Sequence, residues 1–172
     1  SSLLTFGGYN STLLGSKEVG YTPCVTTAQL GGLAYWTVPL DEFRMGSASF
    51  RGDGYTTIVD SGTSLIYIPA GTAAAMYQIL QAIEPNDCIS DASGFHCQPS
   101  VDLSKFPSVT IRMTQYGGTG NDTVLTLPPE SLFLELDSQL VFGVIASSDS
   151  VVILGDVFMR QYYTLFDKAN TR

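Results

Sequence analysis

Charged side chains are scarce in this chain of 172 residues, because Asp, Glu, Lys and Arg together make up only 14% of it. Cations are scarcer still, with 8 Lys and Arg against 16 Asp and Glu and a formal net charge of −8. The 44% of hydrophobic residues excludes a disordered chain or a coiled coil. With no basic patch, nucleic acid is not expected as a partner. The acidic balance fits a protein that works at low pH, and it fits simple solubility equally well.

Long apolar runs are also missing, so the sequence predicts no membrane-spanning segment and no membrane partner. No signal peptide is visible, and the chain reads as mature sequence from Ser1 onward. We find no internal repeat, low-complexity segment or linker. The length therefore predicts one domain over residues 1–172 with a core of its own.

The chain has only three cysteines and one histidine. Cys88 and Cys97 flank a polar stretch that looks like the tip of a hairpin, so we expect a disulfide that closes a loop of roughly ten residues and contributes roughly 3 kcal/mol. Their spacing is too long for a redox or zinc motif, and we predict no metal. Cys24 is then either a buried free thiol or paired outside this chain. His96 is expected to be a surface residue.

Two sequons, at Asn10 and Asn121, are candidate glycosylation sites. Such triplets also arise by chance. Together with a disulfide they favour a secreted protein or one from an acidic vacuolar or lysosomal-type compartment.

Short apolar or alternating runs broken by turn residues predict an all-β fold of mostly antiparallel sheets with one or two short helices. The run 151–154 is continuously apolar, which is typical of a strand buried on both faces. Strands are expected over residues 3–6, 21–25, 35–40, 48–50, 56–59, 65–68, 106–113, 124–127, 140–145, 151–154 and 162–167.

Helix formers over 73–83 follow a start signal at 69–72 and precede Pro85, so this stretch predicts an amphipathic helix docked on a sheet. Residues 128–131 open a turn or short helix. Asp156 is expected to cap a helix of one or two turns that ends near Arg160.

The sequence Asp-Ser-Gly-Thr-Ser at positions 60–64 is the strongest functional signal. It lies between two apolar strands, where a carboxylate is costly unless it is hydrogen-bonded or neutralised. Gly62 permits a tight turn, and three neighbouring hydroxyls can hold the acid. The pattern predicts a rigid carboxylate at the base of a cleft. The structural alternative is a capping Asp in a strand-turn-strand.

Together with Ile153-Leu154-Gly155-Asp156 and Tyr35-Trp36, this motif resembles the pepsin-like aspartic proteases, and the chain looks like their C-terminal lobe. The match extends from about Leu3 to Asn170. The order and spacing of these segments are far more specific than one Asp-Ser-Gly. The resemblance implies one lobe of a bilobal acid protease, with the N-terminal lobe absent from this chain.

The resemblance assigns a role to each residue of the loop. Asp60 matches the second catalytic aspartate, and Thr63 matches the hydroxyl that bonds its carboxylate. Ser61 matches the hydroxyl that crosses to the opposite lobe, although the family more often has Thr there. The glycine and its neighbours also match substrate-lining positions, which are Gly62, Thr63, Ser64, Tyr35 and Ile153. For Ile153, a purely structural role in the core is the alternative.

Peptide hydrolysis by this family uses two close carboxylates that share one proton, because like charges so close together cannot both ionise. This chain supplies one, since no other Asp-[Ser/Thr]-Gly occurs. The resemblance therefore implies half of an aspartic endopeptidase derived from a zymogen. An N-terminal lobe on another chain would complete it, with peptide substrates, pepstatin-type inhibitors and no cofactor.

Other readings stay open. The chain could be a catalytically inactive isolated lobe or a non-enzymatic binding domain. A homodimeric protease is a less favoured possibility, because such chains are much shorter. The family's cysteine pairing is not carried over, because its second cysteine is missing here. Arg160 is expected to make a buried structural ion pair.

Overall fold

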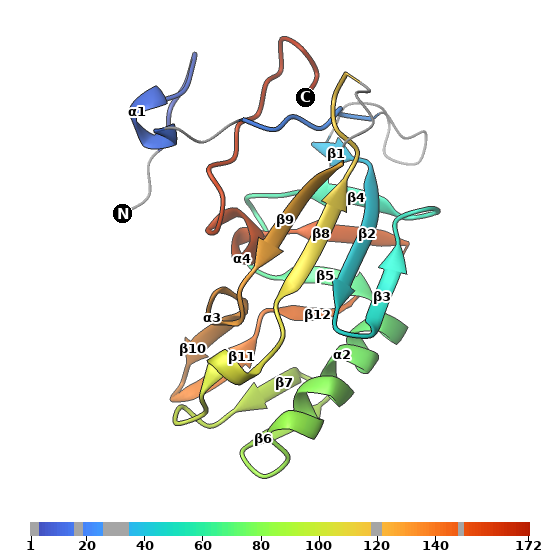
Figure 1. Ribbon diagram of the computed structural model, residues 1–172, viewed down its shortest axis with the longest axis vertical. Helices are drawn as coiled ribbons and strands as arrows, with labels where there is room; N and C mark the ends of the chain where they lie inside the picture. The colour runs from blue at the N-terminus through green and yellow to red at the C-terminus, as the bar shows by residue number, and fades with distance from the viewer. Residues whose placement is uncertain (1–3, 16–18, 26–34, 118–121, 148–149) are drawn as a thin grey trace.

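The computed structural model describes residues 4–15, 19–25, 35–117, 122–147 and 150–172. Three β-sheets and a few short helices form the described chain, with one longer helix, α2, on the flank (Figure 1). The all-β prediction is confirmed. The strands are β1 Thr37–Val38, β2 Leu40–Met45, β3 Ala48–Arg51, β4 Thr56–Val59, β5 Ile66–Pro69, β6 Cys88–Asp91, β7 Gly94–Cys97, β8 Val109–Met113, β9 Thr123–Leu127, β10 Phe133–Leu136, β11 Gln139–Phe142, β12 Val144–Ser147 and β13 Val151–Leu154. The helices are α1 Ser11–Leu14, α2 Ala70–Ile83, α3 Pro129–Leu132 and α4 Asp156–Met159, with a 3₁₀ turn at Leu103–Lys105.

The central sheet has the strand order β1-β4-β13-β5-β12. Its pairings are mixed, since β13 runs parallel to β4 but antiparallel to β5. All four residues of β4 are buried, as its run of Thr, Ile and Val predicts. The strand β13 is less buried than expected, because Val152 and Leu154 face the core while Val151 and Ile153 are partly exposed. Only one face of this strand is therefore fully covered.

A second sheet, ordered β3-β2-β8-β9, lies in front of the central sheet in Figure 1. Its pairings are antiparallel. The register between β2 and β8 shifts between Leu40 and Glu42, directly after Pro39, whose missing N–H favours such an irregularity. The side chains of Phe43, Met45 and Ile111 are fully buried between the layers.

The third sheet, ordered β10-β11-β7-β6, forms the lower end of the molecule in Figure 1. The predicted disulfide is confirmed: Cys88 and Cys97 stand opposite each other in the β6–β7 hairpin and are bonded. Their neighbours Phe95 and Phe142 pack edge to face at 6.4 Å between ring centroids. Disulfide and aromatic packing together hold this hairpin against the core.

The predicted helix is α2, which begins directly after Pro69 and ends at Ile83. Its buried residues are Ala73, Met76 and Leu80, as the spacing of the apolar positions requires. Tyr77 donates a hydrogen bond from its hydroxyl to the Val144 carbonyl at 2.9 Å, and burial raises its pKa to about 12. Helix α2 is thereby fixed to the edge strand of the central sheet.

Several local expectations are wrong. Residues 4–6, 21–25 and 162–167 form no strand, and in 21–25 the backbone makes isolated bonds, such as Cys24 N–H to the Thr171 carbonyl, instead of a continuous ladder. The cap of α4 is Gly155, so Asp156 is the first helical residue and makes no side-chain cap. The short helix after Pro128 is confirmed as α3.

Candidate active site

Asp60 begins the loop that connects β4 to β5. Its backbone N–H donates to the Leu154 carbonyl at 3.1 Å, so the end of β13 fixes where the loop starts. The Thr63 N–H returns to the Asp60 carbonyl at 3.3 Å and closes the turn. A buried strand followed by this tight turn leaves the Asp60 side chain partly exposed at the edge of the sheet.

Both carboxylate oxygens of Asp60 accept hydrogen bonds from its own loop. The Thr63 hydroxyl donates to Oδ2 at 2.6 Å, and the Gly62 N–H donates to Oδ1 at 2.9 Å. A Cβ at position 62 would lie 3.2 Å from Oδ1, which explains why glycine suits this close approach. The loop holds the acid in one orientation.

These bonds favour the charged form of the carboxylate. The Thr63 hydroxyl and then the Gly62 N–H lower the pKa of Asp60, and slight desolvation opposes them weakly. No Lys or Arg among the described residues forms an ion pair with Asp60. The site therefore presents an ionised, uncompensated carboxylate that can accept a proton.

The segment after β13 supports the loop from below. Asp156 N–H donates to the Thr63 carbonyl at 2.8 Å, and Val157 N–H donates to the Ser64 carbonyl at 3.1 Å. Gly155 makes this crossing possible, since a Cβ there would lie 2.2 Å from the Thr63 carbonyl oxygen. Segments 60–64 and 154–157, far apart in sequence, thus form one unit.

The other predicted site residues lie on this loop, just before β1, or in β13. Ser61, Gly62 and Ser64 are exposed on the loop itself. Tyr35 is 50% exposed and precedes Trp36, whose carbonyl accepts the Val59 N–H at 2.9 Å. Ile153 is partly buried in β13 opposite Ile58 and Tyr67. Their roles toward a substrate stay predictions.

The candidate glycosylation sites are described in part. Asn10 is exposed, and its side-chain oxygen accepts the Thr12 N–H at 3.0 Å, so it caps α1. Asn121 lies outside the described residues. Cys24 forms no disulfide with any described cysteine, and burial raises the pKa of its thiol.

Two predictions about charged residues are wrong. His96 is only 13% exposed, its Nδ1 is buried without a partner among the described residues, and its Nε2 lies 2.8 Å from the Ser93 hydroxyl. Arg160 is exposed and forms no ion pair with the described residues, because the single turn of α4 directs it away from the core.

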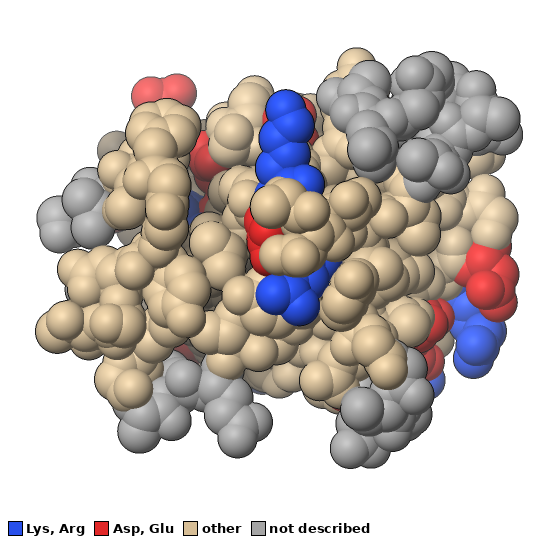
Figure 2. All heavy atoms as spheres, turned by 90° about the horizontal axis from the view of Figure 1, so that it is seen from above, with Lys and Arg blue, Asp and Glu red and all other residues tan. Residues whose placement is uncertain are grey.

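An aromatic groove at the upper end of the molecule was not foreseen. It has a volume of about 530 Å³, and its walls include Tyr9, Trp36, Leu125, Phe158 and Phe166. Figure 2 views this end, where most of the described surface belongs to uncharged residues. The signal was the aromatic stretch 162–166, which the sequence analysis assigned to a strand.

Tyr162, in that stretch, was also missed. Its hydroxyl donates to the Thr126 carbonyl at 2.7 Å and accepts the Thr126 N–H at 2.6 Å, so it closes part of the open edge of β9.

Among the described residues, no group of three or more His, Cys, Asp or Glu is arranged to hold a metal ion. Within the same residues, no helix has the length and apolar character to cross a membrane.

Comparison with known proteins agrees with this geometry. The model of the family "eukaryotic aspartyl protease" matches residues 1–172. Cathepsin E of Oryctolagus cuniculus is 34% identical over 180 residues, which cover 99% of this chain and 40% of that protein. Gastricsin of Macaca fuscata fuscata is 29% identical over 98% of this chain and 42% of its own length. An aspartic protease of Phaffia rhodozyma is 28% identical over 100% of this chain and 40% of its own length.

The chain thus spans well under half the length of these curated relatives. The family model nevertheless matches all of this chain, and each of these relatives matches at least 98% of it. It belongs to the eukaryotic aspartyl protease family.

Proposed function

We propose that this chain is the C-terminal lobe of an aspartic endopeptidase and that Asp60 is one of two catalytic carboxylates. The observation that carries the proposal is the Asp60 side chain, held by Thr63 and Gly62 and left without a cation among the described residues. A partly exposed carboxylate with two loop donors and no cation stays charged and accessible to a partner group. The second aspartate comes from an N-terminal lobe on another chain.

The proposed chemistry follows from the pairing of two acids. Asp60 stays ionised, because its loop lowers its pKa, and it accepts a proton from the attacking water. The partner carboxyl is then protonated, since like charges so close together do not both ionise, and it polarises the scissile carbonyl. The pair titrates as a unit.

This pairing fixes the pH dependence. Activity falls when the pH drops below the lower apparent pKa of the pair, because both acids are then protonated. It also falls when the pH rises above the higher value and the second acid loses its proton. The proposed enzyme therefore works in an acidic setting, secreted or in a vacuolar or lysosomal-type compartment, on peptide substrates and under inhibition by pepstatin-type compounds.

The test combines solution mass with cleavage. We expect the chain alone to be inactive, and its complex with a polypeptide that carries a second Asp-[Ser/Thr]-Gly to cleave a denatured protein at acid pH. Asp60→Asn should abolish cleavage while the far-UV circular dichroism stays unchanged. The matched control is Asp53→Asn, because Asp53 is exposed and its one ion pair among the described residues is with neighbouring Arg51.

Three results would contradict the proposal: retained cleavage by Asp60→Asn, cleavage that pepstatin does not inhibit, or an intact two-lobe assembly without activity. If a dimer of this chain cleaves the substrate, the second aspartate comes from a second copy of the chain and not from an N-terminal lobe.

A further inference from the structure

The strand β6 is an open edge of its sheet, at the end of the order β10-β11-β7-β6. Gln98 N–H donates to the Asp87 carbonyl at 2.8 Å, which fixes the alternation of bonded and non-bonded pairs in this hairpin. By this alternation, Cys88 and Ser90 direct their peptide groups away from β7. The Cys88 carbonyl accepts a bond from the Gln81 side chain at 2.6 Å. The peptide groups of Ser90 have no partner among the described residues.

A groove lies between this edge and helix α2. Its volume is about 480 Å³, and it is lined by Ala74, Tyr77, Gln78, Gln81, Ala82 and Ser90. The helix contains no charged residue over its 14 positions, and Ala74, Gln78 and Ala82 are exposed. Small side chains on one wall and the open edge at Ser90 on the other leave room for an extended backbone, which would displace the Gln81 side chain from the Cys88 carbonyl.

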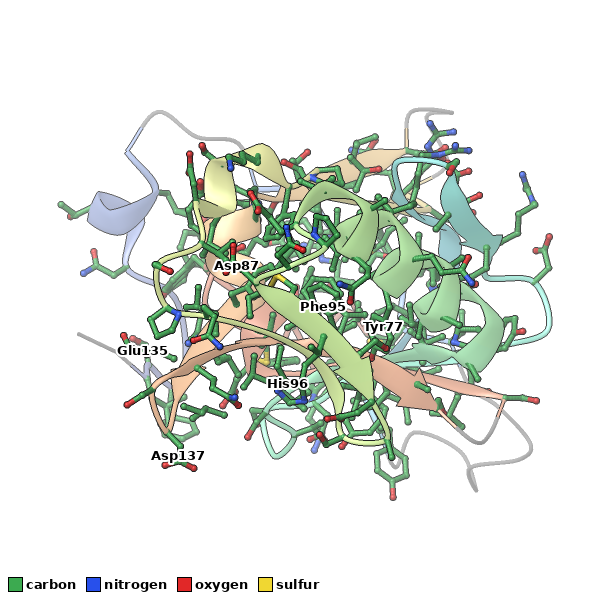
Figure 3. All side chains as sticks on the ribbon, turned by 90° about the horizontal axis from the view of Figure 1, so that it is seen from below. Tyr77, Asp87, Phe95, His96, Glu135 and Asp137 are labelled. Atoms are coloured by element: carbon green, nitrogen blue, oxygen red, sulfur yellow. A yellow bond between two sulfur atoms is a disulfide. The ribbon has the colours of Figure 1, made fainter. Side chains whose placement is uncertain are left out.

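The ends of the groove are acidic. Asp87 precedes β6 and Asp91 ends it, and residues 70–98 contain no Lys or Arg. Asp91 lies 3.5 Å from His96, whereas exposed Asp87 forms no direct ion pair with the described residues and interacts only at longer range with Lys105, which pairs with Glu84. Figure 3 shows Asp87 near one end of the hairpin and Tyr77 of α2 beside Phe95 of β7, whose rings lie 5.9 Å apart. A cationic partner complements this charge.

We propose that the β6 edge binds an extended segment of another polypeptide as an added strand. The segment has small or apolar uncharged side chains in its middle, which meet α2, and Lys or Arg at its ends, which meet Asp87 and Asp91. Strand addition of this kind derives affinity from main-chain hydrogen bonds and specificity from the flanking side chains. The proposal does not depend on Asp60, which belongs to the loop between β4 and β5.

A second copy of this chain is a poor occupant of the same edge. Antiparallel pairing of β6 with its own copy would bring the aspartates at positions 87 and 91 of two chains close together. Like charges across a strand pair are destabilising. The charge of the edge thus selects a partner with the opposite sign.

The probe is the peptide acetyl-Lys-Val-Thr-Val-Thr-Lys-amide, titrated into the full chain by calorimetry and by amide chemical shifts. We expect binding, with shifts at Ser90 and along α2. Ser90→Pro removes the outward N–H but no β6–β7 bond, so the hairpin should tolerate it. Loss of a main-chain bond and added bulk should weaken the peptide about tenfold. The matched control is Val124→Pro, which changes the open edge of β9 and should leave binding unchanged.

A charge variant tests the ends of the groove. Asp87→Asn should weaken binding and flatten its salt dependence. Asp137→Asn is the control, because it removes the same charge outside the groove at a residue with φ of 47°, which Asn tolerates.

Absence of binding, or affinity unchanged by Ser90→Pro, would overturn the proposal. If Ser90→Pro does not fold, a probe with N-methylated valines carries the test, and equal binding of that probe refutes strand addition. A dimer in sedimentation that Ser90→Pro dissociates would identify a second copy and overturn the assigned partner.

Discussion

Replacing Gly155 with Ala should destabilise the loop that carries Asp60. Gly155 lies where the end of β13 crosses beneath this loop, and its φ of −90° is ordinary for any residue. Backbone strain is therefore not the reason for glycine at this position. The reason is space, since a Cβ would lie 2.2 Å from the Thr63 carbonyl oxygen and 2.5 Å from that of Leu65.

The size of the effect follows from these distances. Non-bonded heavy atoms are most favourable at about 3.5–4.0 Å, so the two segments must separate by about 1 Å. The separation weakens the bonds from Asp156 N–H to Thr63 and from Val157 N–H to Ser64. Two hydrogen bonds at about 1 kcal/mol each, with overpacking of about 1–2 kcal/mol, give a loss of about 3–4 kcal/mol.

Urea unfolding followed by circular dichroism and by Trp36 fluorescence measures this loss as a lower midpoint at an unchanged slope. The matched control is Gly71→Ala in α2, where nothing lies within 4 Å of the added Cβ. Alanine is the better helix former, so this variant should equal or exceed the original in stability. A free energy of unfolding for Gly155→Ala within about 0.5 kcal/mol of the original would refute the steric argument.

Two further substitutions test single hydroxyls. Thr63→Val should raise the pKa of Asp60, measured by carboxyl carbon NMR, because the Thr63 hydroxyl is the largest cause of its lowered pKa. A lowered pKa stabilises the fold above the pKa of the unfolded chain, and this contribution is lost as the pH falls through the folded value. Thr57→Val should raise the free energy of unfolding by about 1 kcal/mol, because the hydroxyl of Thr57 is buried without a partner among the described residues.

Each hydroxyl has a control. Ser64→Ala removes an exposed hydroxyl of the same loop and should leave the titration of Asp60 unchanged. An Asp60 pKa that Thr63→Val does not shift would show that the 2.6 Å bond does not form in solution. Thr110→Val in β8 is partly exposed and should change stability by less than about 0.5 kcal/mol. A loss of stability in Thr57→Val would indicate a hidden hydrogen bond.

The sequence was most informative where chemistry and local geometry coincide. Gly62 and Thr63 lie within three residues of Asp60, so a turn of five residues already places both donors at the carboxylate. The hairpin disulfide was predictable for the same reason, since Cys88 and Cys97 are joined by a short polar turn. In such segments the chain leaves little choice of arrangement.

Predictions were less successful where the partner of a segment lies far away in sequence. The stretch 162–167 alternates like a strand, but Tyr162 caps Thr126 and Phe166 packs 4.9 Å from Trp36, and neither contact is encoded locally. His96 looked exposed because it follows a polar hairpin tip, yet its side chain is only 13% exposed and its Nδ1 is buried. The alternation of polar and apolar residues predicts on which face of a strand a side chain lies, but it does not predict which distant segment packs on that face.

The sequence by itself determined the all-β class, the helix after Pro69, the hairpin disulfide and the acidic loop at Asp60, because each depends on residues that are neighbours along the chain. Only the tertiary structure decided that Gly155 supports that loop and that β6 keeps an open edge beside α2. It also decided that aromatic residues from both ends of the chain share one groove. These features arise when distant segments compete for the same space and the same hydrogen-bond partners, and that competition is resolved only in the folded chain.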